Sequence, residues 1–125
     1  MIEKRDFYIN GRWAKPVAGR ECVVIDPSTE EPCAVISLGG TADTNAAVAA
    51  AKAALPAWRA TAPEQRLAHV EKILEVYKRR SEDMAQAMSL EMGAPIDMSR
   101  ASQVGAGTWH IENFIEAFKH FDFLR

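Results

Sequence analysis

The chain has 125 residues, of which 48% are hydrophobic and 26% are charged, a composition typical of a globular protein and not of a disordered one. Its 15 basic and 17 acidic residues give a formal net charge of −2, which argues against a nucleic-acid or anionic-membrane partner. No apolar run reaches the length of a signal peptide or a membrane-spanning helix, so the sequence predicts a cytoplasmic protein.

Residues 1–40 are predicted to form strands and turns. Asn10-Gly11 lies between apolar and aromatic residues, a pattern typical of a β-hairpin turn. Two runs rich in β-branched residues, 21–26 and 33–38, predict strands, and residues 27–32 are expected to form the loop between them. Because a two-stranded ribbon is not stable alone in water, we expect it to pack against helices or further strands.

Residues 41–125 are predicted to form about four helices. Their starts are expected at Thr41, Pro63, Ser81 and Pro95. Pro56 is expected to end or kink the first, alanine-rich helix, and Gly93 is expected to cap the third in the left-handed conformation.

Apolar residues at helical spacing predict the packed faces of the second and fourth helices. The two stripes are Leu67, Val70, Leu74 and Tyr77, and Val104, Ile111, Ile115 and Phe118. Near its end the fourth helix carries apolar residues on more than one face, between Phe114 and Leu124. That second apolar face is expected to pack against a surface outside this chain.

The residues that most often carry chemistry do not form a pattern of their own. Cys22 and Cys33 lie in β-branched runs without a cationic neighbour, which favours structural thiols over catalytic ones. The histidines lack metal-ligand spacing, and Glu116 with His120 is better explained as a helical ion pair than as a site. The sequence therefore predicts no self-contained catalytic site.

Gly105-Ala106-Gly107 has the beginning of a dinucleotide-binding loop but not its remainder. His110 stands where the third glycine should be, and no strand is expected before the first glycine. Close packing of helices is the alternative use of two small residues, so a cofactor loop is rejected here.

Five segments, in this order, resemble the opening of the NAD(P)-dependent aldehyde dehydrogenases, and they run through nearly the whole chain. Tyr8–Trp13 is similar to the family's aromatic-Ile-Asn-Gly-x-Trp, and Val24–Thr29 to its Asn-Pro-Ser/Ala-Thr segment. The alanine-rich helix resembles its Asp-x-x-x-Ala-x-x-Ala-Ala…Trp pattern. The matching residues of this helix are Asp43, Ala47, Ala50, Ala51 and Trp58. Arg66 and Leu67 are similar to the start of the family's next helix, and Glu91, Gly93, Ala94 and Pro95 to its Glu-x-Gly-Lys/Ala-Pro turn.

Two positions depart from the family pattern. Glu30 stands where the family usually has glycine, so a backbone position with positive φ would be strained there. Ala94 stands where many members have lysine, which indicates a subgroup without naming its substrate.

The resemblance implies an α/β parent fold with a Rossmann-like cofactor domain, a catalytic domain and an oligomerising extension. Residues 1–125 would be the N-terminal segment of the cofactor-binding domain, with the catalytic and oligomerisation parts absent. Members of the family are dimers or tetramers that oxidise an aldehyde to a carboxylic acid with NAD or NADP. A cysteine forms a thiohemiacetal and then a thioester, which a glutamate-activated water cleaves.

The family's catalytic motifs, Gly-Gln-x-Cys and Glu-Leu-Gly-Gly, and its cofactor-contacting Pro-Trp-Asn do not occur in this sequence. No catalytic or cofactor-binding residue is therefore assigned, and the isolated 125 residues are expected to be inactive and to need the remainder of the dehydrogenase chain as their partner. The alternative is a non-enzymatic helical interaction module from a truncated or split gene.

Two lesser sites follow from the resemblance. Many relatives hold K⁺ or Na⁺ with backbone carbonyls and a carboxylate at positions that match Val24, Ile25 and Glu91; the alternative is that Glu91 only ends a helix. The family lines its aldehyde tunnel partly with the long fourth helix. The matching face carries Gln103, Ala106, Gly107 and His110, for which packing is the alternative role.

Overall fold

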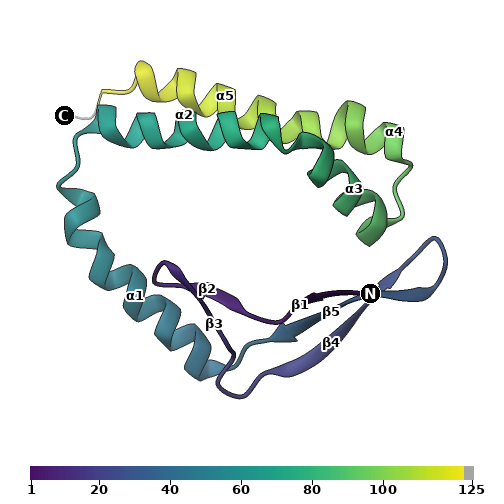
Figure 1. The fold of residues 1–125 in the computed structure, drawn as a ribbon. Helices are drawn as coiled ribbons and strands as arrows, with labels where there is room; N and C mark the ends of the chain where they lie inside the picture. Colours follow the sequence, from purple (N-terminus) through teal and green to yellow (C-terminus); the bar gives the residue numbers. More distant parts are fainter. Residues whose placement is uncertain (123–125) are drawn as a thin grey trace. The chain divides into compact units, whose positions relative to one another are not determined.

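The computed structural model describes residues 1–122 and divides the chain into two compact units, Met1–Ala60 and Thr61–Arg125 (Figure 1). The first unit holds the strands and helix α1, and the second holds the remaining helices. The expected order of a β-rich beginning followed by helices is confirmed.

A three-stranded sheet forms the centre of the first unit. Strands β4 (Arg20–Asp26) and β5 (Glu31–Leu38) are antiparallel, and β1 (Ile2–Lys4) adds to the other edge of β5 in parallel. The middle strand β5 supplies the buried residues Ala34 and Val35. Strand β1 was not predicted, because its three exposed residues carry no alternation of apolar and polar side chains.

The connection between β4 and β5 is shorter than the predicted loop, because Glu31 and Pro32 already belong to β5. The Asp26 carboxylate accepts hydrogen bonds from the Ser28 hydroxyl at 2.6 Å and the Ser28 amide at 2.8 Å. These bonds hold the pKa of Asp26 below its usual value. Glu30 ends the turn with φ of 59°, so the strained position inferred from the missing glycine is confirmed.

A separate hairpin joins β2 (Phe7–Ile9) to β3 (Arg12–Ala14). Its turn residues Asn10 and Gly11 both have positive φ, 54° and 75°, as the Asn-Gly pair predicts. Tyr8 and Trp13 face each other across the hairpin with ring centroids 5.2 Å apart.

Helix α1 (Thr41–Arg59) begins at a buried carboxylate. Asp43 accepts hydrogen bonds from the amides of Gly40 and Val17, each at 2.9 Å. The first bond caps the helix and the second ties the segment after β3 to it, and the two lower the pKa of Asp43. Asp43 thus stays ionised and bonded until the pH falls below the range in which an ordinary carboxylate titrates.

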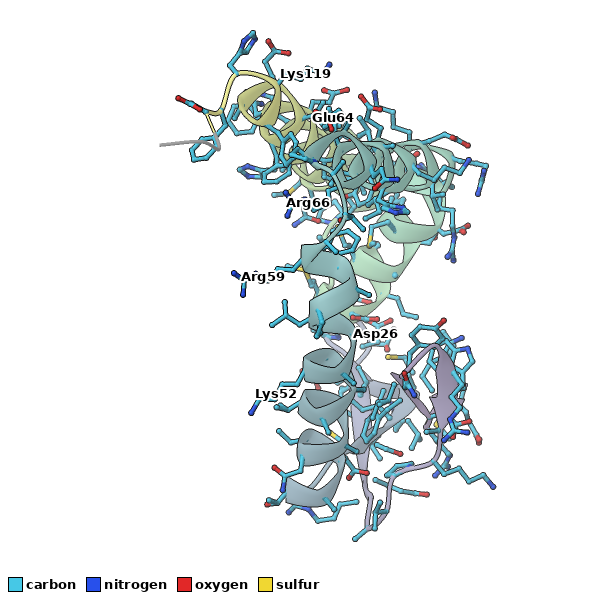
Figure 2. All side chains as sticks on the ribbon, turned by 90° about the vertical axis from the view of Figure 1, so that its left-hand side faces the viewer. Asp26, Lys52, Arg59, Glu64, Arg66 and Lys119 are labelled. Carbon is cyan, nitrogen blue, oxygen red and sulfur yellow. The ribbon has the colours of Figure 1, made fainter. Side chains whose placement is uncertain are left out.

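Of the two effects expected of Pro56, an end or a kink, the first is wrong, because α1 continues to Arg59. Pro56 has no N–H to give to the carbonyl of Lys52, but α1 is exposed there, so water can take that role. Figure 2 shows Lys52 and Arg59 pointing away from the strands of this unit. Three apolar side chains of α1 are also exposed: Val48, Leu55 and Trp58.

The second unit is built from helices packed side by side. They are α2 (Pro63–Arg79), α3 (Ser81–Met92), α4 (Ile96–Met98), the π-helix η1 (Ser99–Gln103) and α5 (Val104–Lys119). Pro63 is the first residue of α2, and Gly93 ends α3 with φ of 67°, as predicted. The long fourth helix predicted after Pro95 is interrupted by η1, which no sequence pattern had indicated.

The predicted stripes of α2 and α5 form the core of this unit. The four α2 residues are half-buried, and Val104 and Ile115 of α5 are buried. Lys78 of α2 and Glu112 of α5 add an exposed ion pair of 2.5 Å beside the contact. Phe114 of α5 and Phe121, which follows the helix, are more than half exposed, and Phe123 and Leu124 lie outside the described residues.

The positive φ of Glu30 leads to a stability prediction. Glu30→Gly should raise the free energy of unfolding by about 1 kcal/mol, because a left-handed conformation costs a residue with a Cβ roughly that much. Urea denaturation of the purified protein measures the change. The control is Glu31→Gly in strand β5, which should lower stability, and equal effects of the two substitutions would contradict the argument.

Candidate functional site

The four candidate tunnel residues lie along one side of the helical unit, where η1 meets α5. Gln103 is the last residue of η1, and Ala106, Gly107 and His110 follow on α5 at spacings of three and four residues. Ala106 and His110 are exposed, whereas Gln103 and Gly107 are half-buried. This face therefore offers one amide, one imidazole and two small residues.

Gly107 has a packing role that its neighbours on this face do not share. A Cβ built on Gly107 would overlap the hydroxyl of Tyr77 and lie 2.6 Å from its Cζ. The absent side chain thus admits the Tyr77 ring from α2, and the Tyr77 hydroxyl donates a hydrogen bond of 3.1 Å to the Val104 carbonyl. A cofactor loop is not possible at this position, because the space beside the glycine is already filled.

The π-turn of η1 precedes this face and has an unusual interior. Ser99 is completely buried and is the largest fully buried side chain of the described residues. Its hydroxyl donates a hydrogen bond of 2.9 Å to the Oε1 atom of Gln103. The amide of Val104 donates to the Ser99 carbonyl, five residues earlier, which is the bond that defines a π-turn.

An ion pair holds η1 against α3. Arg100 binds Glu82 with two hydrogen bonds, 2.7 Å and 3.0 Å long, and lies 3.6 Å from Asp97. The hydrogen bond from Arg100, with a second from Gln86, lowers the pKa of Glu82 to about 2, and Glu82 in turn raises the pKa of Arg100. Both side chains are about half exposed, so the pair orients the two helices more than it stabilises them.

The remaining chemically active side chains are dispersed. The His110 ring meets the Trp109 ring edge to face, with ring centroids 4.9 Å apart, and His120 pairs with Glu116 at 2.8 Å, as predicted. Cys33 donates to the Val24 carbonyl at 3.4 Å, and Cys22 lies half-buried on β4. Within residues 1–122 no three His, Cys, Asp or Glu side chains gather as metal ligands.

The three candidate cation ligands are divided between the two units. Val24 and Ile25 lie in β4, where the register with β5 shifts between them, and Ile25 faces Pro32. Proline has no N–H, so Pro32 cannot donate a ladder hydrogen bond to β4 at this point, and the Val24 carbonyl accepts from the Cys33 thiol instead. Glu91 is the second-last residue of α3 and is exposed. Carbonyl and carboxylate oxygens of this kind fit a hard cation.

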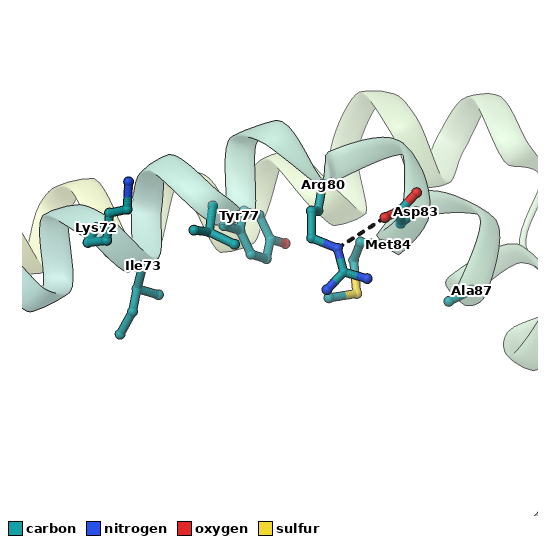
Figure 3. A pocket seen from close by; sticks show the side chains of 8 residues that line it. Lys72, Ile73, Tyr77, Arg80, Asp83, Met84 and Ala87 are labelled. Atoms are coloured by element: carbon teal, nitrogen blue, oxygen red, sulfur yellow. Dashed lines mark hydrogen bonds and ion pairs between the residues drawn. The ribbon is translucent and has the colours of Figure 1, made fainter. Parts of the chain in front are cut away.

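A groove between α2 and α3 was not predicted from the sequence. It has a volume of about 480 Å³ and a mainly apolar lining that includes Ile73, Val76, Tyr77, Met84 and Ala87 (Figure 3). Met84 belongs to a row with Met88 and Met92 whose spacing favours a core position, yet Met84 and Met92 are exposed. The ion pair of Arg80 and Asp83, marked by the dashed line, lies between Tyr77 and Ala87 in Figure 3.

The contrast between two glycines of α5 gives a packing test. Gly107→Ala should lower the free energy of unfolding by about 2 kcal/mol, since the new methyl group displaces the Tyr77 ring. Gly105→Ala is the matched control: its Cβ meets nothing within 4 Å, so better helix propensity should raise stability by up to about 1 kcal/mol. Chemical denaturation measures both, and a stabilising Gly107→Ala would refute the packing role.

The chain matches known proteins over almost all of its length. The model of the aldehyde dehydrogenase family matches residues 13–123. A 3-succinoylsemialdehyde-pyridine dehydrogenase from a Pseudomonas species is 35% identical over 98% of this chain and 26% of its own length.

None of the helices within residues 1–122 combines the length and the apolar character that a membrane span requires.

Solved structures give the same result. An aldehyde dehydrogenase from Bartonella henselae is 56% identical with a TM-score of 0.97, over 98% of this chain and 26% of that one. Aldehyde dehydrogenase C from Pseudomonas syringae, solved with NAD⁺ and octanal, is 39% identical with a TM-score of 0.92, over 95% and 24%. The chain thus spans about a quarter of the length of these relatives. It belongs to the aldehyde dehydrogenase family, of which it represents the N-terminal segment.

Proposed function

We propose that this chain is the N-terminal part of an enzyme that oxidises an aldehyde to a carboxylic acid with NAD or NADP. The match to the family model over residues 13–123 carries the proposal, and relatives solved with NAD⁺ support the choice of cofactor. The bound nicotinamide would accept the hydride of the substrate. The catalytic cysteine, the cofactor contacts and the dimer or tetramer interface belong to the remainder of the dehydrogenase.

In the full-length enzyme this segment would face the substrate and support the tunnel, without taking part in the chemical steps. Gln103 at the end of η1 and Ala106 and His110 of α5 share a face, which would form one wall of the aldehyde tunnel. Tyr77 fixes α5 against α2 at Gly107, and Arg100 fixes η1 against α3, so the wall is held at two points. Within this proposal residues 1–125 belong to the cofactor-binding domain.

The test is to compare the isolated segment with the full-length dehydrogenase that contains it. The full-length enzyme should produce reduced nicotinamide from NAD⁺ or NADP⁺ only when an aldehyde such as octanal is added, and the segment alone should produce none. Absorbance of the reduced cofactor and recovery of the carboxylic acid measure the reaction. A full-length protein that is folded and oligomeric but oxidises no aldehyde would refute the proposal.

The alternative is a helical interaction module without catalytic activity, and the exposed apolar face of α5 is the feature that favours it. Phe114, Ala117, Phe118 and Phe121 line a pocket of about 280 Å³ there. In an enzyme this face would be covered by the remainder of the same chain. The codons after Arg125 distinguish the two functions. An in-frame continuation that encodes Gly-Gln-x-Cys supports the enzyme, and a stop codon supports the interaction module.

We also propose that the carbonyls of Val24 and Ile25 and the carboxylate of Glu91 contribute to a K⁺ or Na⁺ site in the full-length enzyme. The proline opposite Ile25 and the exposed carboxylate support this assignment. A cation that binds only the folded enzyme would raise its stability.

The cation site predicts a salt-specific change in the melting temperature, Tm. When K⁺ or Na⁺ is present at about ten times the Kd of the site, the free energy of unfolding should be about 1.4 kcal/mol higher than in choline chloride of equal ionic strength, and the Tm should rise accordingly. Glu91→Gln should abolish this difference, whereas Glu71→Gln, an exposed glutamate of α2, should preserve it. A cation effect that survives in Glu91→Gln would disprove the assignment.

A further inference from the structure

The buried Ser99 hydroxyl and the Gln103 carboxamide form a pair that the tunnel wall alone does not explain. A helical serine usually returns its hydroxyl to the carbonyl four residues earlier, as Ser102 does with Met98 at 2.9 Å. Ser99 instead donates forward to Gln103, and only its amide binds the Pro95 carbonyl, at 3.0 Å. The hydroxyl of a serine that is completely buried is thus used to hold a side-chain amide.

The hydrogen bond determines which end of the Gln103 amide is free. Oε1 accepts from Ser99, so the Nε2 group, with two N–H donors, is the end that can bind another molecule. Within residues 1–122 these N–H groups have no partner. Gln103 shares its helix face with the exposed residues Ala106 and His110.

The π-turn gives this arrangement its rigidity. The hydrogen bond from the Val104 amide to the Ser99 carbonyl closes the turn that contains the extra residue of η1. The Val104 carbonyl in turn accepts a hydrogen bond from the Tyr77 hydroxyl. Arg100, the residue after Ser99, is held by Glu82. A fixed donor loses less entropy on binding a ligand than a free glutamine does.

We propose that Ser99 is a positioning residue that presents the Gln103 N–H groups to the aldehyde tunnel, where they select aldehydes with a hydrogen-bond acceptor along their chain. The inference rests on the proposed function, because it requires that α5 faces the substrate. It assigns the substrate class: aldehydes with an ether, carbonyl or hydroxyl oxygen or a ring nitrogen beyond the reacting group, in preference to purely alkyl ones.

The test uses the full-length dehydrogenase and two kinds of probe. One is octanal, and the others are its ether isosteres, in which an oxygen replaces a methylene at successive positions of the chain. The wild-type enzyme should prefer at least one isostere in kcat/KM. Gln103→Leu should reduce that preference by about three- to tenfold through the KM of the preferred isostere, the usual effect of one lost hydrogen bond.

The effect of Ser99 should pass through Gln103. Ser99→Ala should reduce the same preference by a similar factor, and it should have no further effect in the Gln103→Leu background. Ser99→Cys, with a similar volume and a weaker donor, should lie between and covers the case in which Ser99→Ala does not fold. The matched control is Ser89→Ala, which removes another part-buried serine hydroxyl, bound to the Ala94 carbonyl at 2.8 Å, and should leave the preference intact.

The outcomes separate the two levels of the argument. A wild-type enzyme that oxidises no aldehyde refutes the proposed function. An enzyme that oxidises octanal and every isostere equally well, or that keeps its preference in Gln103→Leu, overturns the inference alone. Loss of preference in Gln103→Leu but not in Ser99→Ala or Ser99→Cys overturns the positioning role of Ser99.

Discussion

The helical unit depends on the contact between the Tyr77 ring and the glycine at position 107. Two helices can approach this closely only where one of them lacks a side chain, and the tyrosine uses that space to place its hydroxyl on the Val104 carbonyl. The contact fixes the register of α2 against α5, so that the apolar stripes of the two helices meet and Val104 and Ile115 become buried. It also holds α5 at the point where η1 ends, and the candidate tunnel face begins there.

Features encoded by neighbouring residues could be predicted from the sequence. Asn10-Gly11, Gly93 and the position of Glu30 each have a backbone conformation that one or two residues determine, and the structure has those conformations. The apolar stripes of α2 and α5 were also predictable, since spacing alone determines which side chains share a face.

Features that depend on distant partners could not be predicted. Strand β1 exists because β5 offers an open edge, and its own three residues do not indicate a strand. The π-turn and the forward hydrogen bond of Ser99 depend on packing between helices, which leaves no periodic signal. The candidate tunnel residues were recognised by resemblance to the family. The need for a glycine at position 107 could not be predicted, because it comes from the ring of Tyr77, thirty residues earlier in the chain. The three cation ligands, two in strand β4 of the first unit and one in helix α3 of the second, stay a prediction.

The π-turn has a consequence for how the family can vary. A π-turn contains one residue more than a regular helical turn, so it is equivalent to a single-codon insertion within a continuous helix. Loss of that codon would rotate α5 by about 100° relative to α4, because each residue of an α-helix turns the chain by that angle. A different row of side chains would then occupy the present position of Gln103, Ala106 and His110. In-frame gain or loss of one codon is therefore a route by which descendants of this gene could exchange the whole face at once, where point mutations would change it one residue at a time.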